Sequence, residues 1–258
     1  MVESPVRRKI LGVIPARYTS SRYPGKPLAL IGSKTMLEHV FERASLARYL
    51  TSVIIATDDQ RIAAAARSFG APVRMTRADH LSGTDRVAEV ASADTAELIV
   101  NIQGDEPLID PAAIDAAILP LLHADDIGMG TLKKRIEDPR ELADPNVVKV
   151  VTDRNGDAMY FSRLPIPYVR DDSEEPLRCY KHIGLYVYER DFLLTYPTLP
   201  VGPLERAERL EQLRAMENGF KIRVVETEYE SLGVDTPADL DRVSRLFDAS
   251  ILQGVRNG

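Results

Sequence analysis

The sequence predicts an α/β protein with a mostly parallel central sheet and helices on both faces. Buried strands and amphipathic helices alternate from residue 9 to residue 122, and this β-α-β order is typical of parallel sheets. The 258 residues, 44% of them hydrophobic, are enough for one sizeable core. We therefore expect a single domain over residues 1–258, in which about residues 127–200 form a smaller β-rich lobe.

Each element of the first half has a local signal. Short apolar runs predict strands over 9–14, 51–57, 72–75 and 97–102. Apolar residues at helical spacing predict helices over 35–50, 60–69, 84–93 and 111–122. Asp58 and Asp59 are good caps for the second of these helices, Gly70 closes it, and Pro111 lies in the first turn of the last one.

The pattern changes after residue 127. The segment 147–162 contains two β-rich runs around Asn155-Gly156, which is a strong hairpin signal. The aromatic run 179–189 predicts a long strand, and charged amphipathic segments predict helices over 204–217 and 237–247. These elements make up the predicted lobe and the end of the domain.

Composition limits the partners and the compartment. With 33 Lys and Arg against 39 Asp and Glu, the net charge of −6 provides no basic field for a nucleic-acid backbone. Cys179 is the one cysteine, so no intrachain disulfide can form. No apolar run approaches the ~20 residues that span a bilayer, and residues 1–16 lack the apolar core of a signal peptide. We expect a cytoplasmic protein that binds neither membrane nor nucleic acid.

The loop after the first predicted strand is dense in positive charge. Arg17, Arg22 and Lys26 lie there, and Gly25 allows the backbone to come close to a ligand. In open α/β sheets the loop after the first strand is a usual place for phosphates, so a polyphosphate would suit these cations. A solvated loop that makes surface salt bridges is the alternative. The loop matches neither the Walker A pattern nor the GxGxxG pattern of dinucleotide folds.

Eight motifs occur in order along the chain. They are ARYTSSRYPGKPL, ATDD, HLSGTDR, NIQGDEPLI, YFSRLPIP, KHIGLY, LEQLR and GVDTPADL. Together they resemble the 3-deoxy-manno-octulosonate cytidylyltransferases, or CMP-Kdo synthetases, over roughly residues 8–245. The resemblance implies a Rossmann-like nucleotidyltransferase fold whose smaller lobe serves sugar binding and dimerisation. It also implies a homodimer that uses CTP and Mg²⁺, joins CMP to the acidic sugar Kdo (3-deoxy-D-manno-octulosonate) and releases diphosphate, for lipopolysaccharide biosynthesis.

The same resemblance assigns the catalytic and nucleotide residues. Arg17, Arg22 and Lys26 become the triphosphate clamp, because attack at an α-phosphate requires its charge to be neutralised. Asp105 and Asp235 match the two family aspartates that bind Mg²⁺, and Arg17 and Lys26 join them as catalytic residues. Taken alone, each aspartate could instead cap the helix that follows it, although Asp110 is the better cap in the first segment.

The base and the sugar have separate candidate residues. The resemblance places the nucleotide against the small loop and the amide of Ser82, Gly83, Thr84 and Gln103. It places the sugar against Arg163, His182, Tyr186, Glu211 and Gln212. Arg163 can hold a carboxylate through two parallel hydrogen bonds. Other candidates also fit structural roles: the loop 82–84 could cap a helix, His182 could be a structural residue of a strand, and Glu211 and Gln212 could belong to a charged amphipathic helix.

Two other readings remain open at the level of sequence. The acceptor could be 8-amino-Kdo or another nonulosonic acid, since Tyr23, Tyr168 and the segment GSKTML differ from the commoner family pattern. A non-catalytic paralogue that binds a nucleotide as a regulator is the second reading. It predicts loss of Lys26, Asp105 or Asp235, and all three are present.

Overall fold

The computed structural model describes residues 8–19, 23–80, 82–124, 126–168, 170 and 178–256, with side chains described as far as residue 247. The chain divides into two compact units. Unit 1 contains residues 1–8, 96–100 and 113–230, and unit 2 contains residues 9–95, 101–112 and 231–258. Each unit is built from segments that are far apart in the sequence.

Unit 2 is built on three parallel strands, which are β1 (Ile10–Ala16), β4 (Ser52–Thr57) and β5 (Val73–Met75). In register, Leu11 pairs with Ser52 and Ile55 with Val73. Successive side chains of a strand point to opposite faces, and Val13 and Ile14 are both fully buried. Both faces of this sheet are therefore covered, as predicted from the apolar runs.

The helices of unit 2 begin at the polar caps that their sequences supply. Thr35 accepts from the backbone of Glu38 at the start of α1 (Met36–Ala44), and Asp59 caps α2 (Gln60–Ser68). Ser82 and Asp85 form a capping box at α3 (Gly83–Ser92). The first helix is shorter than predicted, because the chain turns at residues 46 and 47, whose N–H groups donate to carbonyls three residues earlier.

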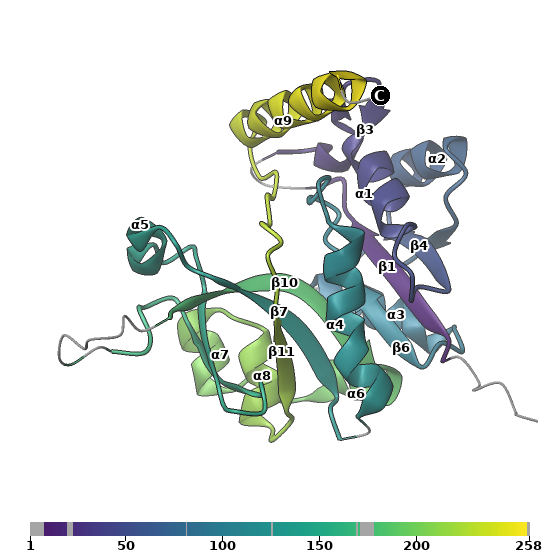
Figure 1. Cartoon of the computed structure of the whole chain (residues 1–258). Helices are drawn as coiled ribbons and strands as arrows, with labels where there is room; N and C mark the ends of the chain where they lie inside the picture. The colour runs from purple at the N-terminus through teal and green to yellow at the C-terminus, as the bar shows by residue number, and fades with distance from the viewer. Residues whose placement is uncertain are drawn as a thin grey trace, which may run out of the picture. The chain divides into compact units, whose positions relative to one another are not determined.

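A helix and a small hairpin complete unit 2. The short helix η1 (Lys26–Leu28) leads into the hairpin of β2 (Leu30–Ile31) and β3 (Lys34–Thr35). Helix α9 (Pro237–Arg256) lies against this hairpin (Figure 1). Ile31, Met36, Val234 and Val243 form the buried cluster between them, so the end of the chain is tied to the loop region that follows β1.

Unit 1 contains a mixed sheet with the order β11-β7-β10-β6. These strands are β6 (Leu98–Asn101), β7 (Met129–Arg135), β10 (Tyr180–Glu189) and β11 (Ile222–Glu226). β7 runs parallel to β11 and antiparallel to β10. The hairpin β8 (Lys149–Thr152) and β9 (Ala158–Ser162) joins β10 through the pair Lys149 and Lys181. This confirms the hairpin predicted around Asn155-Gly156.

Helices cover both faces of the unit 1 sheet. The helices of unit 1 are α4 (Pro111–His123), α5 (Pro139–Ala143), α6 (Arg190–Thr195), η2 (Tyr196–Thr198), α7 (Pro203–Glu208) and α8 (Gln212–Glu217). Leu121 of α4 packs on Gly130, whose register partner is Val187, while the neighbouring Tyr186 faces Gln212 of α8. α4 and α8 therefore lie on opposite faces of the sheet, as Figure 1 also shows.

The predicted helix 204–217 is two helices, and that prediction was wrong in one respect. Arg209 adopts a left-handed conformation, with φ 53° and ψ 49°, and its N–H donates to Glu205 O at 2.7 Å. This ends α7, and α8 starts three residues later. The uninterrupted helical spacing of apolar residues gives no signal for the break, since Arg is an unusual residue in this conformation.

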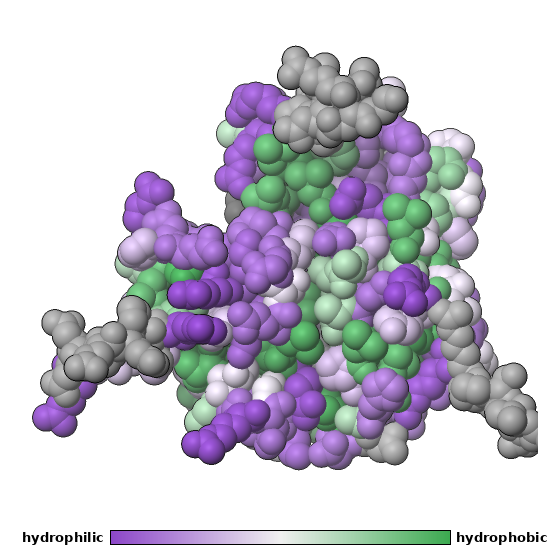
Figure 2. Space-filling view, in the orientation of Figure 1, coloured by the Kyte–Doolittle hydropathy of each residue, from purple (hydrophilic) through white to green (hydrophobic). Residues whose placement is uncertain are grey.

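The surface agrees with the composition. On the face shown in Figure 2, hydrophilic residues predominate and hydrophobic ones gather in separate patches. Within the described residues, no helix combines the length and the apolar character needed to cross a bilayer.

Candidate active site

One ammonium group joins two distant aspartates in unit 2. Lys26 Nζ donates to Asp105 Oδ2 at 2.7 Å and to Asp235 Oδ1 at 3.2 Å. The lysine side chain is 13% exposed, and the two carboxylates are 33% and 46% exposed. The structure thus brings three of the predicted catalytic residues into contact, at a place that a ligand can reach from solvent.

Two further hydrogen bonds hold the aspartate segments side by side. The N–H of Val234 donates to the carbonyl of Asp105 at 2.9 Å. The hydroxyl of Ser231 donates to Glu106 Oε1 at 2.7 Å, and the Glu106 side chain is buried. These two bonds hold the segments that carry the two aspartates side by side without any contribution from Lys26.

The capping alternative does not apply to either aspartate. The cap before α4 is Asp110, whose Oδ1 accepts from the N–H of Ala112 at 2.9 Å. At the start of α9, Thr236 Oγ1 accepts from the N–H of Asp239 at 3.3 Å, and Asp239 Oδ2 accepts in return from the N–H groups of Asp235 and Thr236. Both helix starts therefore have other caps, and the carboxylates of Asp105 and Asp235 both accept from Lys26.

Arg17 fastens the loop after β1 to the start of α3. Its Nη2 donates to the carbonyls of His80 and Ser82, each at 2.8 Å. These bonds use both hydrogens of Nη2, so Nε and Nη1 are the groups that could hold a phosphate. Arg22, the third predicted phosphate residue, lies outside the described residues.

Close backbone packing fixes the loops around this site. Gly25 has φ +74°, and a Cβ there would meet the Tyr18 ring at 3.1 Å. The glycine is therefore needed both for the turn and for the close packing of this ring. A Cβ on Gly104 would lie 2.9 Å from the carbonyl oxygen of Pro15. The loops after β1 and β6 therefore touch at Pro15, beside Gln103.

The loop predicted to hold the base is also the start of α3. Ser82 Oγ accepts from the N–H of Asp85, and the Ser82 N–H donates to Asp85 Oδ2, each at 3.1 Å. The Ser82 side chain is thus a helix cap, and Thr84 is buried. Any contact with a base through Ser82 and Gly83 would use backbone groups, which the N-terminus of a helix offers to ligands.

The carboxylate oxygens that contact Lys26 are suitable ligands for Mg²⁺. In the described part of the chain, no group of three or more His, Cys, Asp or Glu side chains is arranged to hold a metal ion. Two carboxylates remain, those of Asp105 and Asp235. Mg²⁺ prefers oxygen ligands and is commonly held by one or two carboxylates together with substrate phosphates and water. The residues present therefore fit this ion when a triphosphate supplies further oxygens.

In unit 1 the predicted sugar residues gather around β10. His182 Nε2 lies 2.9 Å from Thr131 Oγ1, and the Thr131 hydroxyl also lies within 3.0 Å of the carbonyls of Ile183 and Leu185. Because those carbonyls draw the hydroxyl hydrogen, we assign the His182 proton to Nε2, which leaves Nδ1 as an acceptor. Desolvation lowers the pKa of His182 to about 3, so the ring is neutral at physiological pH.

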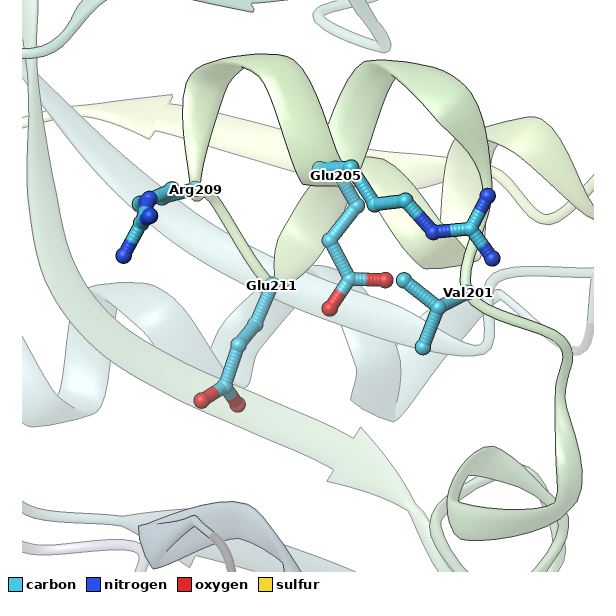
Figure 3. Close-up of a pocket in the computed structure, with 5 residues that line it drawn as sticks. Val201, Glu205, Arg209 and Glu211 are labelled. Atoms are coloured by element: carbon cyan, nitrogen blue, oxygen red, sulfur yellow. The ribbon is translucent and has the colours of Figure 1, made fainter.

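Tyr186 and α8 lie next to that histidine. The ring centroids of His182 and Tyr186 are 5.4 Å apart, and the Tyr186 hydroxyl donates to Gln212 Oε1 at 3.3 Å. Burial raises the pKa of Tyr186 well above its usual value. Glu211 lines a hollow of about 520 Å³ with Val201, Glu205, Arg206 and Arg209. Figure 3 shows Arg209 and Glu211 leaving the turn between α7 and α8.

Arg163 is held by backbone carbonyls. Its Nε donates to Glu208 O at 2.7 Å and its Nη1 to Pro145 O at 2.9 Å. The Glu208 carboxylate in turn accepts from the Ser162 hydroxyl and from the Arg163 N–H. The guanidinium therefore links three segments of unit 1, and Nη2 together with the second hydrogen of Nη1 is left to meet a carboxylate.

Sequence reasoning missed the residues that hold the predicted ones in place. Glu106 and Glu208 each lie within or beside a motif, but nothing in the pattern marks them as partners of Ser231 and Arg163. Lys149 is fully buried and donates to the carbonyls of Asp144, Val147 and Arg163. A lysine on a strand gives no sequence signal for such a role.

Comparison with known proteins identifies the family. The cytidylyltransferase family profile matches residues 11–222. A 3-deoxy-manno-octulosonate cytidylyltransferase from Solibacter usitatus is 77% identical over 97% of this chain and 99% of the relative. The chain belongs to the 3-deoxy-manno-octulosonate cytidylyltransferase family. A member from Geobacter metallireducens is 58% identical over 91% of this chain and 96% of its own length.

Solved structures agree with the family. A CMP:2-keto-3-deoxy-manno-octonic acid synthetase complexed with CTP is 45% identical, with a TM-score of 0.90 over 94% of this chain and 99% of that one. A 4-diphosphocytidyl-2C-methyl-D-erythritol synthase from Anaerococcus prevotii, at 15% identity and a TM-score of 0.62 over 93% and 96% of the two chains, shares the fold. The predicted family, fold class and enzyme class are thus confirmed, whereas the individual site residues stay predictions.

Proposed function

We propose that this chain transfers the cytidylyl group of CTP to the anomeric hydroxyl of Kdo and releases diphosphate, as a step of lipopolysaccharide biosynthesis. The observation that carries the proposal is the convergence of Asp105 and Asp235 on Lys26, from motifs 130 residues apart. The names of the relatives and the CTP complex of the 45% identical structure support the same substrates.

The reaction forms one P–O bond and breaks another. The anomeric oxygen attacks the α-phosphorus, the bond from that phosphorus to the bridging oxygen breaks, and diphosphate leaves with the electron pair while the hydroxyl proton passes to solvent. Lys26 and the Nε and Nη1 of Arg17 neutralise the negative charge that gathers on the phosphates, and Arg22 has the same proposed role. The start of α3 and Gln103 orient the cytosine.

Asp105 and Asp235 are the residues that would hold Mg²⁺. When bound, this ion supplies charge neutralisation at the phosphates and orients the triphosphate for in-line displacement. The remaining work belongs to the chain. The backbone bond from Val234 to Asp105 keeps the two aspartate segments side by side, so the ligand does not have to bring them together.

The sugar acid binds to the residues of unit 1. His182 Nδ1 accepts from a sugar hydroxyl, while Tyr186, Glu211 and Gln212 provide further polar contacts. Arg163 meets the sugar carboxylate through Nη2, since Nε and Nη1 are already bonded to backbone carbonyls. A neutral histidine and a braced arginine suit binding better than proton transfer, because neither changes charge near neutral pH.

The assembly and the compartment follow from the same proposal. The protein works as a homodimer in the cytoplasm, where nucleoside triphosphates are made. Leu164 and Tyr168 are 70% and 86% exposed in unit 1, and such side chains are suited to a subunit contact. Sedimentation at working concentration tests the dimer: a second copy predicts a mass near twice 28.7 kDa, and a monomer at every concentration would remove it.

Charge-neutralising variants test the catalytic assignment. Asp105→Asn and Asp235→Asn should each lower diphosphate release from CTP and Kdo by at least about 100-fold while the circular dichroism spectrum is unchanged. Asp110→Asn is the control, because this residue only caps α4 and should keep near-normal turnover. Near-normal turnover in both Asp105→Asn and Asp235→Asn would refute the assignment.

A further inference from the structure

Lys26 contacts the carboxylate oxygens that a metal ion would need. Its nitrogen is 2.7 Å from one carboxylate and 3.2 Å from the other, and it donates a hydrogen to each. Mg²⁺ held by Asp105 and Asp235 would need carboxylate oxygens, and one oxygen of each residue now accepts from the ammonium. The positive charge of Lys26 beside these oxygens would repel the ion.

We propose that Lys26 is a counter-ion that blocks the metal site until CTP arrives. The ammonium neutralises Asp105 and Asp235, and it leaves them when triphosphate oxygens offer it a second set of acceptors. The divalent ion then enters with the nucleotide, so metal and CTP bind cooperatively and the ion alone binds weakly. This inference rests on the proposed function in so far as these two carboxylates hold the ion.

The geometry of the neighbourhood favours displacement of the side chain over rearrangement of the site. Asp105 is held by the backbone bond from Val234, and Asp235 lies one residue beyond Val234, so neither segment depends on Lys26. Lys26 itself lies on a three-residue helix, and its flexible four-carbon stem can swing without moving the backbone. The carboxylates stay together while the lysine leaves.

The proposal makes a prediction whose sign is unusual for a catalytic residue. Lys26→Met should bind Mn²⁺ at least about tenfold more tightly than the wild type in the absence of nucleotide, because a positive charge within about 4 Å of the ion is removed. Free Mn²⁺ is measured by electron paramagnetic resonance. Lys26→Arg keeps the charge and should bind as weakly as the wild type.

Matched variants separate this effect from a general change in charge. Lys34 also lies between two carboxylates, those of Glu38 and Glu42, and Lys34→Met should leave Mn²⁺ affinity unchanged. Adding Asp105→Asn to Lys26→Met should abolish the gain. If Lys26→Met does not fold, Lys26→Gln replaces it, since a side chain of similar length can still donate to one carboxylate.

Each result has a clear reading. Tighter Mn²⁺ binding by Lys26→Met that depends on Asp105 supports the counter-ion role. Equal or weaker binding, or a gain that survives Asp105→Asn, overturns it. Mn²⁺ binding is measured without turnover, so the two proposals can fail separately. If Lys26→Met does not bind Mn²⁺ more tightly while the wild type releases diphosphate normally, only this inference is wrong. If Mn²⁺ binding changes as expected but no diphosphate is released, the proposed acceptor chemistry is wrong.

Discussion

The hydroxyl of Ser231 donates to the carboxylate of Glu106 at 2.7 Å, across 125 residues of sequence. These two residues flank the candidate metal ligands, since Glu106 follows Asp105 and Ser231 precedes Asp235 by four positions. The bond therefore links the two segments at a second point, beside the backbone bond from Val234.

Removing this link should weaken metal binding more than folding. We expect Ser231→Ala to raise the Mg²⁺ concentration for half-maximal diphosphate release by about tenfold, the lower end of the cost of losing a residue that orients metal ligands. Ser231→Thr keeps the hydroxyl and should restore the wild-type value. An unchanged Mg²⁺ dependence in Ser231→Ala would show that the Val234 bond alone sets the carboxylate separation.

Arg163→Ala should affect the sugar far more than the nucleotide. We expect the KM for Kdo to rise by more than about tenfold while the KM for CTP stays within about twofold, because Nη2 is the group assigned to the sugar carboxylate. The lost bonds to the Glu208 and Pro145 carbonyls should also lower the free energy of unfolding by about 1.5–3 kcal/mol. A defect confined to CTP would mean that Arg163 is wrongly placed.

His182 predicts a pH-dependent stability. Its folded-state pKa of about 3 lies below the ordinary value of 6.5. Between pH 6.5 and pH 3 the unfolded chain therefore binds a proton on this residue that the folded chain does not bind. The free energy of unfolding should therefore fall as the pH drops from 6.5 towards 3, by at most about 1.4 kcal/mol per pH unit for this residue.

Urea unfolding of the wild type and of His182→Gln at pH 4, 5, 6 and 7 measures this contribution. The variant keeps a donor towards Thr131 but does not titrate, so its stability should fall less steeply with acid. Other groups titrate in both proteins and cancel in the difference. Parallel curves would show that His182 is protonated as easily in the folded protein as in the unfolded one.

Gly25, in the loop after β1, and Gly32, in the turn of the β2–β3 hairpin, separate backbone strain from steric contact. Both have positive φ, +74° and +61°, but a Cβ on Gly25 meets the Tyr18 ring at 3.1 Å while one on Gly32 meets nothing within 4 Å. We expect Gly32→Ala to cost about 1 kcal/mol of unfolding free energy and Gly25→Ala about 1–3 kcal/mol more. Only Gly25→Ala should weaken CTP binding, as measured by calorimetry. Equal effects of both would mean that Tyr18 moves aside freely.

Local signals in the sequence were enough to predict much of unit 2. The apolar runs and the caps at Asp59 and Asp110 act within a few residues, and the structure confirms them. The hairpin at Asn155-Gly156 is local in the same way, with Gly156 at φ +84°. Such features depend on backbone conformation and short-range hydrogen bonds, which a sequence pattern records directly.

Features that depend on distant contacts were not predictable in this way. The break at Arg209 lies beside Glu208, whose carboxylate and carbonyl accept from Ser162 and Arg163 of a distant segment. The family resemblance named Lys26, Asp105 and Asp235, but periodicity could not show that one ammonium joins them or that Ser231 and Glu106 hold them. The partners of Arg163 were missed because they are backbone carbonyls, which no residue type identifies.

Diphosphate release from CTP and Mg²⁺, with Kdo, 8-amino-Kdo and N-acetylneuraminate offered in parallel to the full chain, tests the proposed function most directly. We expect release with Kdo and little with the other two acids. Preference for another acid would keep the transfer chemistry and move the assignment of the sugar residues. No release with any acid, from a folded protein that still binds CTP, would contradict the proposed function and favour a nucleotide-binding paralogue.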